Sequence, residues 1–176
     1  MPPPSTSRIR FRPWSPELRA DFAVLACDPR VVRHIPPGTP WPEERIDEFV
    51  ARQMRHERDR GHSMWWIGRA DAADMPIGFC GLQPVPDGSH VEIGWWLRPE
   101  QQGRGLASEA ARAVLAWAWQ ATALPAVLAH TVAANTESLR VMERIGMQRL
   151  GVFPAASQGR PGLDLELTVY RAERPR

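Results

Sequence analysis

The stretch from Val91 to Gln120 constrains the fold more than any other part of the chain. Residues 91–97 are apolar and aromatic and too few for a helix, and Pro99 ends any strand that they form. The sequence up to Gln120 is rich in Ala, Leu and Trp, which favours a helix. The pattern therefore predicts a strand, a loop and a long helix, with Gly103 and Gly105 at the helix N-terminus.

These two glycines stand where a helix can bind an anion. The first turn of a helix has backbone N–H groups without partners and a positive dipole end, and Arg104 adds charge. A plain strand-to-helix connection would use the same glycines. A Walker loop is disfavoured because Leu106 and Ala107 stand where Lys and Ser or Thr are required. A dinucleotide fingerprint is disfavoured because Ser108 stands at its third glycine.

Three segments, in the right order, resemble the GNAT acetyltransferases. Gln102-x-x-Gly105-x-Ala107 is similar to the family's pyrophosphate-binding signature, Q/R-x-x-G-x-G/A. The preceding strand EIGWWL and the pair Asn135-x-x-Ser138, with its helix, are similar to two other parts of the family. The resemblance covers nearly the whole chain. It is closest to the subgroup that acetylates protein N-termini, including those of ribosomal proteins, and to related small-molecule acetyltransferases.

The resemblance implies an α/β GNAT fold in one domain, residues 1–176, with residues 1–7 as a disordered leader. The mixed central sheet would have about seven strands, splayed between the fourth and fifth, and about four flanking helices. Acetyl-CoA would be the co-substrate, without a metal. The residues that the resemblance assigns to acetyl-CoA are Trp96, Leu97, Arg98, Gln102, Gly103, Arg104, Gly105, Ala107, Ser108 and Asn135.

Glu92 is the first catalytic candidate. Along the strand at 91–97, alternation places Glu92, Gly94 and Trp96 on one face. A carboxylate among apolar neighbours would have a raised pKa and could accept a proton from an incoming ammonium. In several GNAT enzymes a glutamate at the matching place does so. A glutamate bonded to an arginine or a backbone N–H at the sheet surface is the alternative, and Gly94 indicates a bulge or a close backbone approach.

Ser138 is the second catalytic candidate. Many GNAT members have a tyrosine just before the glutamate of this helix as general acid, but Met142 occupies that place and cannot donate a proton. In the ribosomal subgroup the serine of Asn-x-x-Ser faces the coenzyme sulfur, so Ser138 would hydrogen-bond the developing thiolate. A helix-surface serine without a role is the alternative. Asn135 is also expected to be the helix N-cap on physical grounds alone.

The rest of the chain fits an α/β domain. Before the central strand we expect a strand at 9–11, helices beginning at Ser15 and Pro42, and an antiparallel meander with strands at 62–69 and 77–83. After the long helix we expect a parallel strand at 126–132, a helix from Asn135 to Gly146, and strands at 147–152 and 163–170. By resemblance, His34 and Trp41 would shape the acceptor entrance. Asp164 or Glu166 could hold a cationic substrate, although a solvated strand face fits them better.

Composition limits the partners. With 22 basic and 20 acidic residues the net charge is +2, which argues against a dedicated nucleic-acid binder. No apolar run approaches the ~20 residues that cross a membrane, and no signal peptide is evident, so we expect a cytoplasmic protein. Cys27 and Cys80 lack zinc-site spacing and are expected to be reduced core thiols. Eight tryptophans leave a homodimer open.

Together these features predict an N-acetyltransferase in which a primary amine attacks acetyl-CoA directly. A protein N-terminal α-amine is the first acceptor expected, followed by small amines such as polyamines, amino acids or an aminoglycoside. A non-catalytic acetyl-CoA-binding module would have the same cofactor residues without a working Glu92 and Ser138. A nicotinamide-binding protein would require a parallel sheet, against which the meander argues.

Overall fold

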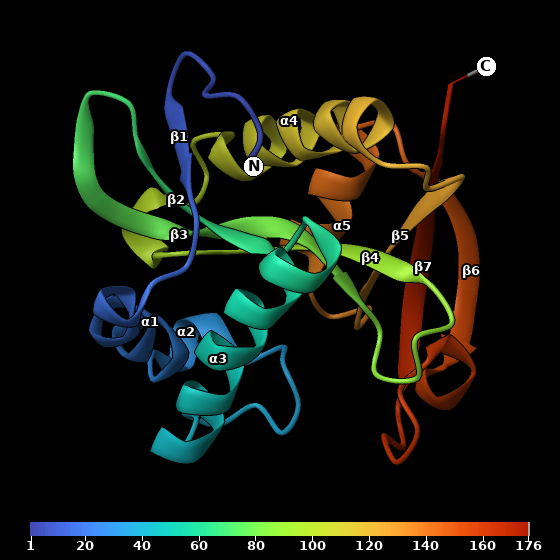
Figure 1. The fold of residues 1–176 in the computed structure, drawn as a ribbon. Coiled ribbons are helices and arrows are strands. Elements are labelled where there is room, and N and C mark those ends of the chain that lie inside the picture. The colour runs from blue at the N-terminus through green and yellow to red at the C-terminus, as the bar shows by residue number, and fades with distance from the viewer. Residues whose placement is uncertain (176) are drawn as a thin grey trace.

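The computed structural model describes residues 1–175, which fold around one seven-stranded sheet of order β1-β2-β3-β4-β5-β7-β6 (Figure 1). The strands are β1 Ile9–Arg12, β2 Met64–Arg69, β3 Ala72–Pro84, β4 Val91–Leu97, β5 Ala126–Thr131, β6 Gln148–Pro154 and β7 Glu166–Glu173. The helices are α1 Arg19–Ala26, α2 Pro29–Val32, α3 Glu43–Arg60, α4 Leu106–Ala121 and α5 Thr136–Arg144.

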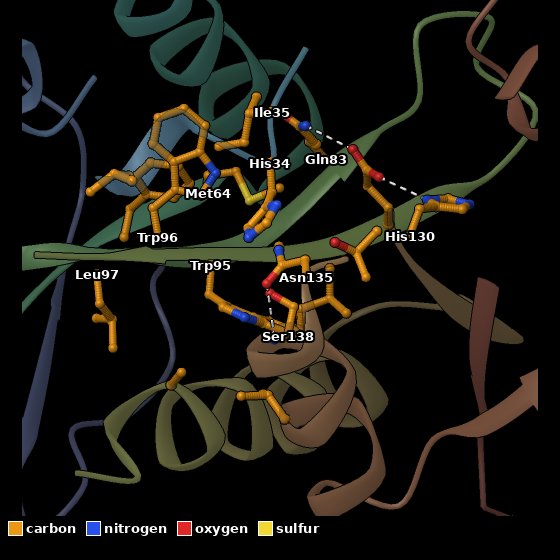
Figure 2. Close-up of a pocket in the computed structure, with 18 of the residues that line it drawn as sticks. His34, Ile35, Met64, Gln83, Trp95, Trp96, Leu97, His130, Asn135 and Ser138 are labelled. Carbon is orange, nitrogen blue, oxygen red and sulfur yellow. Dashed lines mark hydrogen bonds and ion pairs between the residues drawn. The ribbon is translucent and has the colours of Figure 1, made fainter. Parts of the chain in front are cut away.

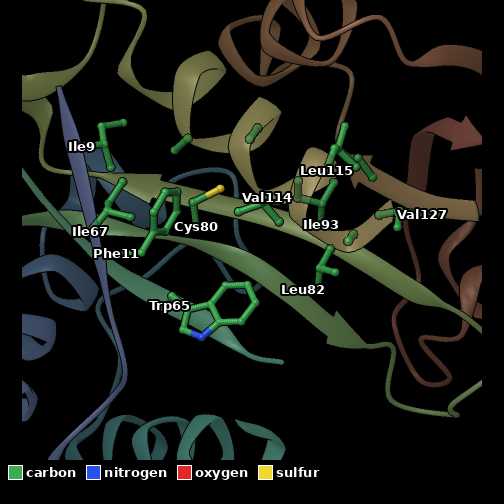
Figure 3. Close-up of a cluster of buried hydrophobic side chains, with 14 of the residues drawn as sticks. Ile9, Phe11, Trp65, Ile67, Cys80, Leu82, Ile93, Val114, Leu115 and Val127 are labelled. Carbon is green, nitrogen blue, oxygen red and sulfur yellow. The ribbon is translucent and has the colours of Figure 1, made fainter. Parts of the chain in front are cut away.

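Helices cover both faces of the sheet (Figure 1). On one face α4 packs on an aliphatic core, part of which Figure 3 shows, with Ile93 and Leu82 from the sheet against Val114 and Leu115. On the other face α1, α2 and α3 enclose an aromatic cluster. Its rings are Trp14, Phe22, Trp41, Phe49, Trp66, Phe79 and Trp96, packed mostly edge to face. Both cores pack on the central strand β4. This packing from two sides holds β4 rigidly between the helical layers.

The sheet is split next to β4. Strand β4 pairs with β3 along its whole length, from Pro84 opposite Val91 to Gly78 opposite Leu97. With β5, its parallel neighbour, it shares a single residue pair, Glu92 with Leu128. The two strands therefore separate beyond Glu92, and the sheet opens into a fork whose closed end is marked by that residue.

The structure confirms the predicted fold class and the two faces of the central strand. Ile93 and Trp95 belong to the core under α4, whereas Trp96 belongs to the aromatic cluster. Gly94 makes no bulge, because its register with β3 is unbroken; a Cβ there would meet only the side chain of Met64.

Several elements differ from the prediction: β3 begins at Ala72 and not at residue 77, and β7 is Glu166–Glu173 and not residues 163–170. A fifth helix, α2, is a single turn in the proline-rich region, capped by the side chain of Asp28. Ser15 precedes a 3-10 turn, Pro16–Leu18, without a side-chain cap. In the segment before β1, Thr6 and Ser7 donate to the carboxylate of Glu109 on α4. No helix within residues 1–175 has the length and apolar character that crossing a bilayer requires.

Candidate active site

A cavity of about 980 Å³ occupies the fork and continues to the side of the sheet that α3 covers. It brings together most of the residues predicted from sequence. Glu92 and Ser138 both line it, as do Trp96, Leu97, Gln102, Gly103, Gly105, Ala107, Ser108 and Asn135. His34 and Trp41, expected at the acceptor entrance, line it as well. Figure 2 shows Trp95 and Trp96 on opposite sides of the strand, with Asn135 and Ser138 facing Trp95.

The glycine loop leaves the N-terminus of α4 open. Gly103 and Gly105 have φ angles of 73° and 76°, in the left-handed region that favours glycine. A Cβ at Gly103 would meet nothing within 4 Å, and one at Gly105 would meet only the guanidinium of Arg8 at 3.7 Å. Ser108, in the first turn, has a buried hydroxyl without a hydrogen-bond partner. The loop thus has the space and the unpaired donors that a phosphate group needs.

Gln102 holds the loop against the central strand, since its side-chain amide donates to the carbonyl of Leu97 over 3.0 Å. Arg98 and Arg104 do not line the cavity. The backbone N–H of Arg98 donates to Ile77, and its guanidinium pairs with Asp21. The main-chain N–H of Arg98 is therefore already used inside the sheet, and the assignment of Arg98 and Arg104 to acetyl-CoA stays a prediction.

Glu92 is 5% exposed and lies at the centre of a hydrogen-bond network at the closed end of the fork. Its Oε1 accepts from Gln83 at 2.9 Å, and its Oε2 accepts from Nδ1 of His130 at 3.0 Å (Figure 2). Nη2 of Arg160 lies 2.7 and 2.6 Å from the two oxygens. Gln83 in turn accepts from the buried Gln53 of α3 at 3.1 Å. The carboxylate is thus held from α3, β3, β5 and the loop before β7.

The expected raised pKa of Glu92 is wrong. Burial by itself raises the pKa of this carboxyl, but the hydrogen bond from His130 and the charge of Arg160 outweigh it and lower the pKa to about 2. Apolar neighbours alone would have produced the expected rise. Glu92 is therefore a fixed negative charge at neutral pH and a weak proton acceptor.

A chain of hydrogen bonds leads from Glu92 to the surface. Because Nδ1 of His130 donates to Glu92, its Nε2 is an acceptor, and Nε2 of His90 lies 3.2 Å from it. His90 then accepts at Nδ1 from the hydroxyl of Ser89 at 3.0 Å, in the exposed turn before β4. All donors of this chain point toward Glu92, so both ring nitrogens of His130 are occupied and the chain fixes the orientation of the imidazole and of the carboxylate.

Asn135 and Ser138 lie on the opposite wall of the fork. The side-chain oxygen of Asn135 accepts from the backbone N–H of Ser138 at 3.2 Å, so the predicted N-cap is confirmed. The side chain of Met142, which occupies the place of the family's tyrosine, is buried. Tyr170, the one tyrosine of the sequence, donates to Glu143 at 3.1 Å and does not line the cavity. In the part of the chain that the structure describes, Ser138 is therefore the hydroxyl of α5 that faces the fork.

Several site residues have little signal in the sequence. His130 is a single histidine in a mostly apolar strand, and Arg160 lies in the loop between the last two predicted strands. Their spacings of 38 and 68 residues from Glu92 give no motif. Arg45, Arg52 and His56 of α3 also line the cavity, and their helical spacing is visible in the sequence. Asp164 and Glu166, considered as binders of a cationic substrate, are exposed and do not line the cavity.

The two cysteines lie away from the cavity. Neither Cys27 nor Cys80 is among the cavity-lining residues, and both thiols are free. Among the side chains that the structure describes, no group of three or more His, Cys, Asp or Glu is placed to bind a metal ion.

Comparison with known proteins agrees with this geometry. A family model described as "Acetyltransferase (GNAT) domain" matches residues 8–148. The uncharacterized N-acetyltransferase YnaD of Bacillus subtilis is 33% identical over 149 residues, which cover 85% of this chain and 84% of that protein.

Solved structures share the fold. An acetyltransferase of Agrobacterium tumefaciens superimposes with a TM-score of 0.83 and 27% identity, over 98% of this chain and 95% of that one. An acetyltransferase of Salmonella typhimurium, described as modifying the N-terminal serine of ribosomal protein L7/L12, has a TM-score of 0.77 at 16% identity, over 97% of both chains. From the family match and the fork with its glycine loop, the chain belongs to the GNAT acetyltransferase family.

Proposed function

We propose that this protein transfers the acetyl group of acetyl-CoA to a primary amine by direct attack, with an α-amine as the preferred acceptor. The observation that carries the proposal is one continuous cavity, which runs from the open N-terminus of α4 through the fork to Glu92 and His130. Acetyl-CoA, when bound, supplies the activated thioester. Gly103, Gly105 and the hydroxyl of Ser108 would hold its pyrophosphate, and Trp96, Leu97 and Asn135 would line its arm.

The low pKa of Glu92 bears on the choice of acceptor. A carboxylate with a pKa of about 2 is a poor match for an ammonium proton, so the site suits an amine that is partly neutral already. At pH 7 an α-amine of pKa ~8 is roughly 10% neutral, whereas a lysine of pKa ~10.4 is neutral to about 0.04%. This difference supports a protein N-terminus or another α-amine over a lysine side chain.

The side chains that line the cavity have different roles in the reaction. His130 and Arg160 hold the Glu92 carboxylate in place. Once the amine nitrogen has bonded to the acetyl carbon it is far more acidic, so even a weak acceptor such as Glu92 can take its proton, directly or through water. Ser138 donates to the sulfur as it gains negative charge. A covalent acetyl-enzyme is not needed, because no thiol lines the cavity within residues 1–175. The two free thiols also support a cytoplasmic location, where cysteines stay reduced.

The first test is calorimetric titration of acetyl-CoA against the wild type and Gly103→Asp. A carboxylate on the loop would face the pyrophosphate and weaken binding by about a hundredfold or more. Gly61→Asp is the matched control: Gly61 has φ 74° and open space around its Cβ, as Gly103 does, but lies at the end of α3 and does not line the cavity. Equal losses in both variants would mean that backbone strain, not the phosphate site, explains the result.

The second test is thiol release from acetyl-CoA with α-amines, lysine side-chain amines and polyamines. Amine-dependent release with α-amines ahead of lysine supports the proposal. Binding without release from any amine would favour an acetyl-CoA-binding module. Absence of binding would overturn the assignment of the loop.

A further inference from the structure

The wall of the cavity opposite the glycine loop is positively charged. Among the described residues that line the cavity, eight are arginines and three are acidic. Arg45, Arg52 and Arg60 belong to α3, and Arg160 comes from the loop before β7. The acids on the same side are Asp87 and Glu92, and Glu92 is already paired with Arg160. A positive potential therefore remains on the acceptor side.

The residues of α3 that line the cavity form one stripe on the helix. Arg45, Phe49, Arg52, His56 and Arg60 are spaced by four, three, four and four residues, so they lie along the same face. Arg45 is fixed, because its guanidinium donates to the carbonyl of Pro36 and stacks 3.8 Å over Trp41. Arg52 has a weaker ion pair, because its Nη1 lies 4.0 Å from the carboxylate of Glu48.

Two buried nitrogens on this wall have no partner in the described chain. Nη2 of Arg160 bonds Glu92, but its Nη1 is buried and makes no hydrogen bond. Nδ1 of His56 is likewise buried without a partner. Leaving a buried polar group unsatisfied is unfavourable, and hydrogen bonds to the acceptor oxygens of a ligand would satisfy these two nitrogens. These orphaned groups point to a ligand with acceptor oxygens.

We propose that the acceptor carries a carboxylate or phosphate close to its primary amine, and that Arg52, His56 and Nη1 of Arg160 bind this anion. The inference rests on the proposed function and specifies its substrate class. The anion would hold the acceptor with its amine toward Glu92, His130 and the fork. Polyamines and aminoglycosides, which have several positive charges and no anion, would be repelled from the same wall.

The test compares acceptors of different charge, with the isosteric Glu and Gln peptides as the strictest pair. The peptides Ser-Glu-Ala-Ala, Ser-Gln-Ala-Ala and Ser-Lys-Ala-Ala, all C-terminally amidated, vary the second side chain. Phosphoethanolamine is compared with ethanolamine to test a phosphate, and spermidine is included as a polycation. We expect kcat/KM to be about tenfold higher or more for the anionic member of each set. The larger ratio of kcat/KM, anionic over neutral acceptor, identifies whether the site prefers a carboxylate or a phosphate. Equal or reversed preference would overturn the inference while leaving amine acetylation intact.

Two variants test whether the preference for anionic acceptors depends on the stripe of α3. Arg52→Gln is expected to remove most of the preference, by lowering kcat/KM for the anionic acceptor about tenfold with little effect on the neutral one. Arg55→Gln is the matched control, since it removes the same charge from an exposed position of α3 that does not line the cavity. A preference that survives Arg52→Gln, or falls equally in Arg55→Gln, would contradict the assignment to this wall.

A binding measurement separates the two proposals. The N-acetylated Glu and Gln peptides, titrated without acetyl-CoA, report on the anion site whether or not any acceptor turns over. Tighter binding of the Glu peptide to the wild type, lost in Arg52→Gln, supports the site; equal binding of the two peptides overturns it. Acetyl-CoA binding without thiol release from any amine would instead overturn the proposed function.

Discussion

Nη2 of Arg160 lies 2.7 and 2.6 Å from the two carboxylate oxygens of Glu92, although 68 residues separate the pair in sequence. Both side chains are largely buried, with exposed fractions of 20% and 7%. This ion pair fixes the loop before β7 against the closed end of the fork. It also keeps Glu92 ionised, and through His130 it sets the orientation of the imidazole at the cavity wall.

Removing the negative charge of this ion pair is expected to destabilise the fold. Glu92→Gln leaves the Arg160 guanidinium buried without a counter-charge, and we expect a loss of about 3 kcal/mol in the free energy of unfolding. Urea denaturation measures this loss. The double variant Glu92→Gln with Arg160→Met should recover much of the stability but not the turnover. A single variant as stable as the wild type would show that the pair contributes little.

Ser138→Ala is expected to lower kcat by roughly tenfold to a hundredfold, because the sulfur loses a donor as it gains charge. Affinity for acetyl-CoA should change little. The cap of α5 survives, since Asn135 accepts from the backbone N–H of Ser138 and not from its hydroxyl. Asn135→Ala, which removes the cap, should instead cost about 1 kcal/mol of stability. Unchanged kcat in Ser138→Ala would leave the serine without a catalytic role.

His56 makes stability depend on pH. Burial, together with the charges of Arg52 and Arg60, lowers the pKa of His56 to about 4 from 6.5. Between these values the unfolded chain binds a proton that the folded chain does not, so this group makes stability fall as pH falls from 6.5 toward 4. Urea denaturation at about pH 7 and pH 5 should show a smaller loss for His56→Gln than for the wild type. Equal losses would contradict the lowered pKa.

The two cysteines should differ in reactivity. Cys27 is exposed, whereas Cys80 is buried, and burial raises the pKa of its thiol. A thiol-alkylating reagent should therefore label Cys27 alone in the folded protein, as mass spectrometry would show. Cys27→Ser should abolish labelling and leave thiol release from acetyl-CoA unchanged. Loss of turnover in that variant would indicate a covalent acetyl-enzyme and contradict direct attack.

Local patterns in the sequence predict most of the helices and strands, and the resemblance to the GNAT family supplies their arrangement in one sheet. The central strand begins and ends at Val91 and Leu97 as predicted, because Pro99 and the glycines after it leave few alternatives. The Asn135 cap is equally local. Helix α2 was missed because one turn among prolines has no apolar period to detect.

The electrostatics of the site depend on tertiary contacts. The sequence places Glu92 among apolar neighbours, and from that alone a raised pKa follows. The groups that reverse the shift, His130 and Arg160, come from β5 and a distant loop, and only the folded topology brings them to the carboxylate. Likewise, the N–H of Arg98 donates to the carbonyl of Ile77 on β3, a contact that has no trace in the local sequence.

The fork has a consequence for the integrity of the protein as well as for its chemistry. Four strands on one side and three on the other share a single rung, Glu92 with Leu128, so the sheet is nearly two sheets. A ligand that lies between the open edges and pairs with both would supply the missing rungs. By linkage, such a ligand at a hundred times its Kd adds about 2.7 kcal/mol to the free energy of unfolding. The supply of acetyl donor would then govern how long each molecule survives proteolysis, in addition to how fast it turns over.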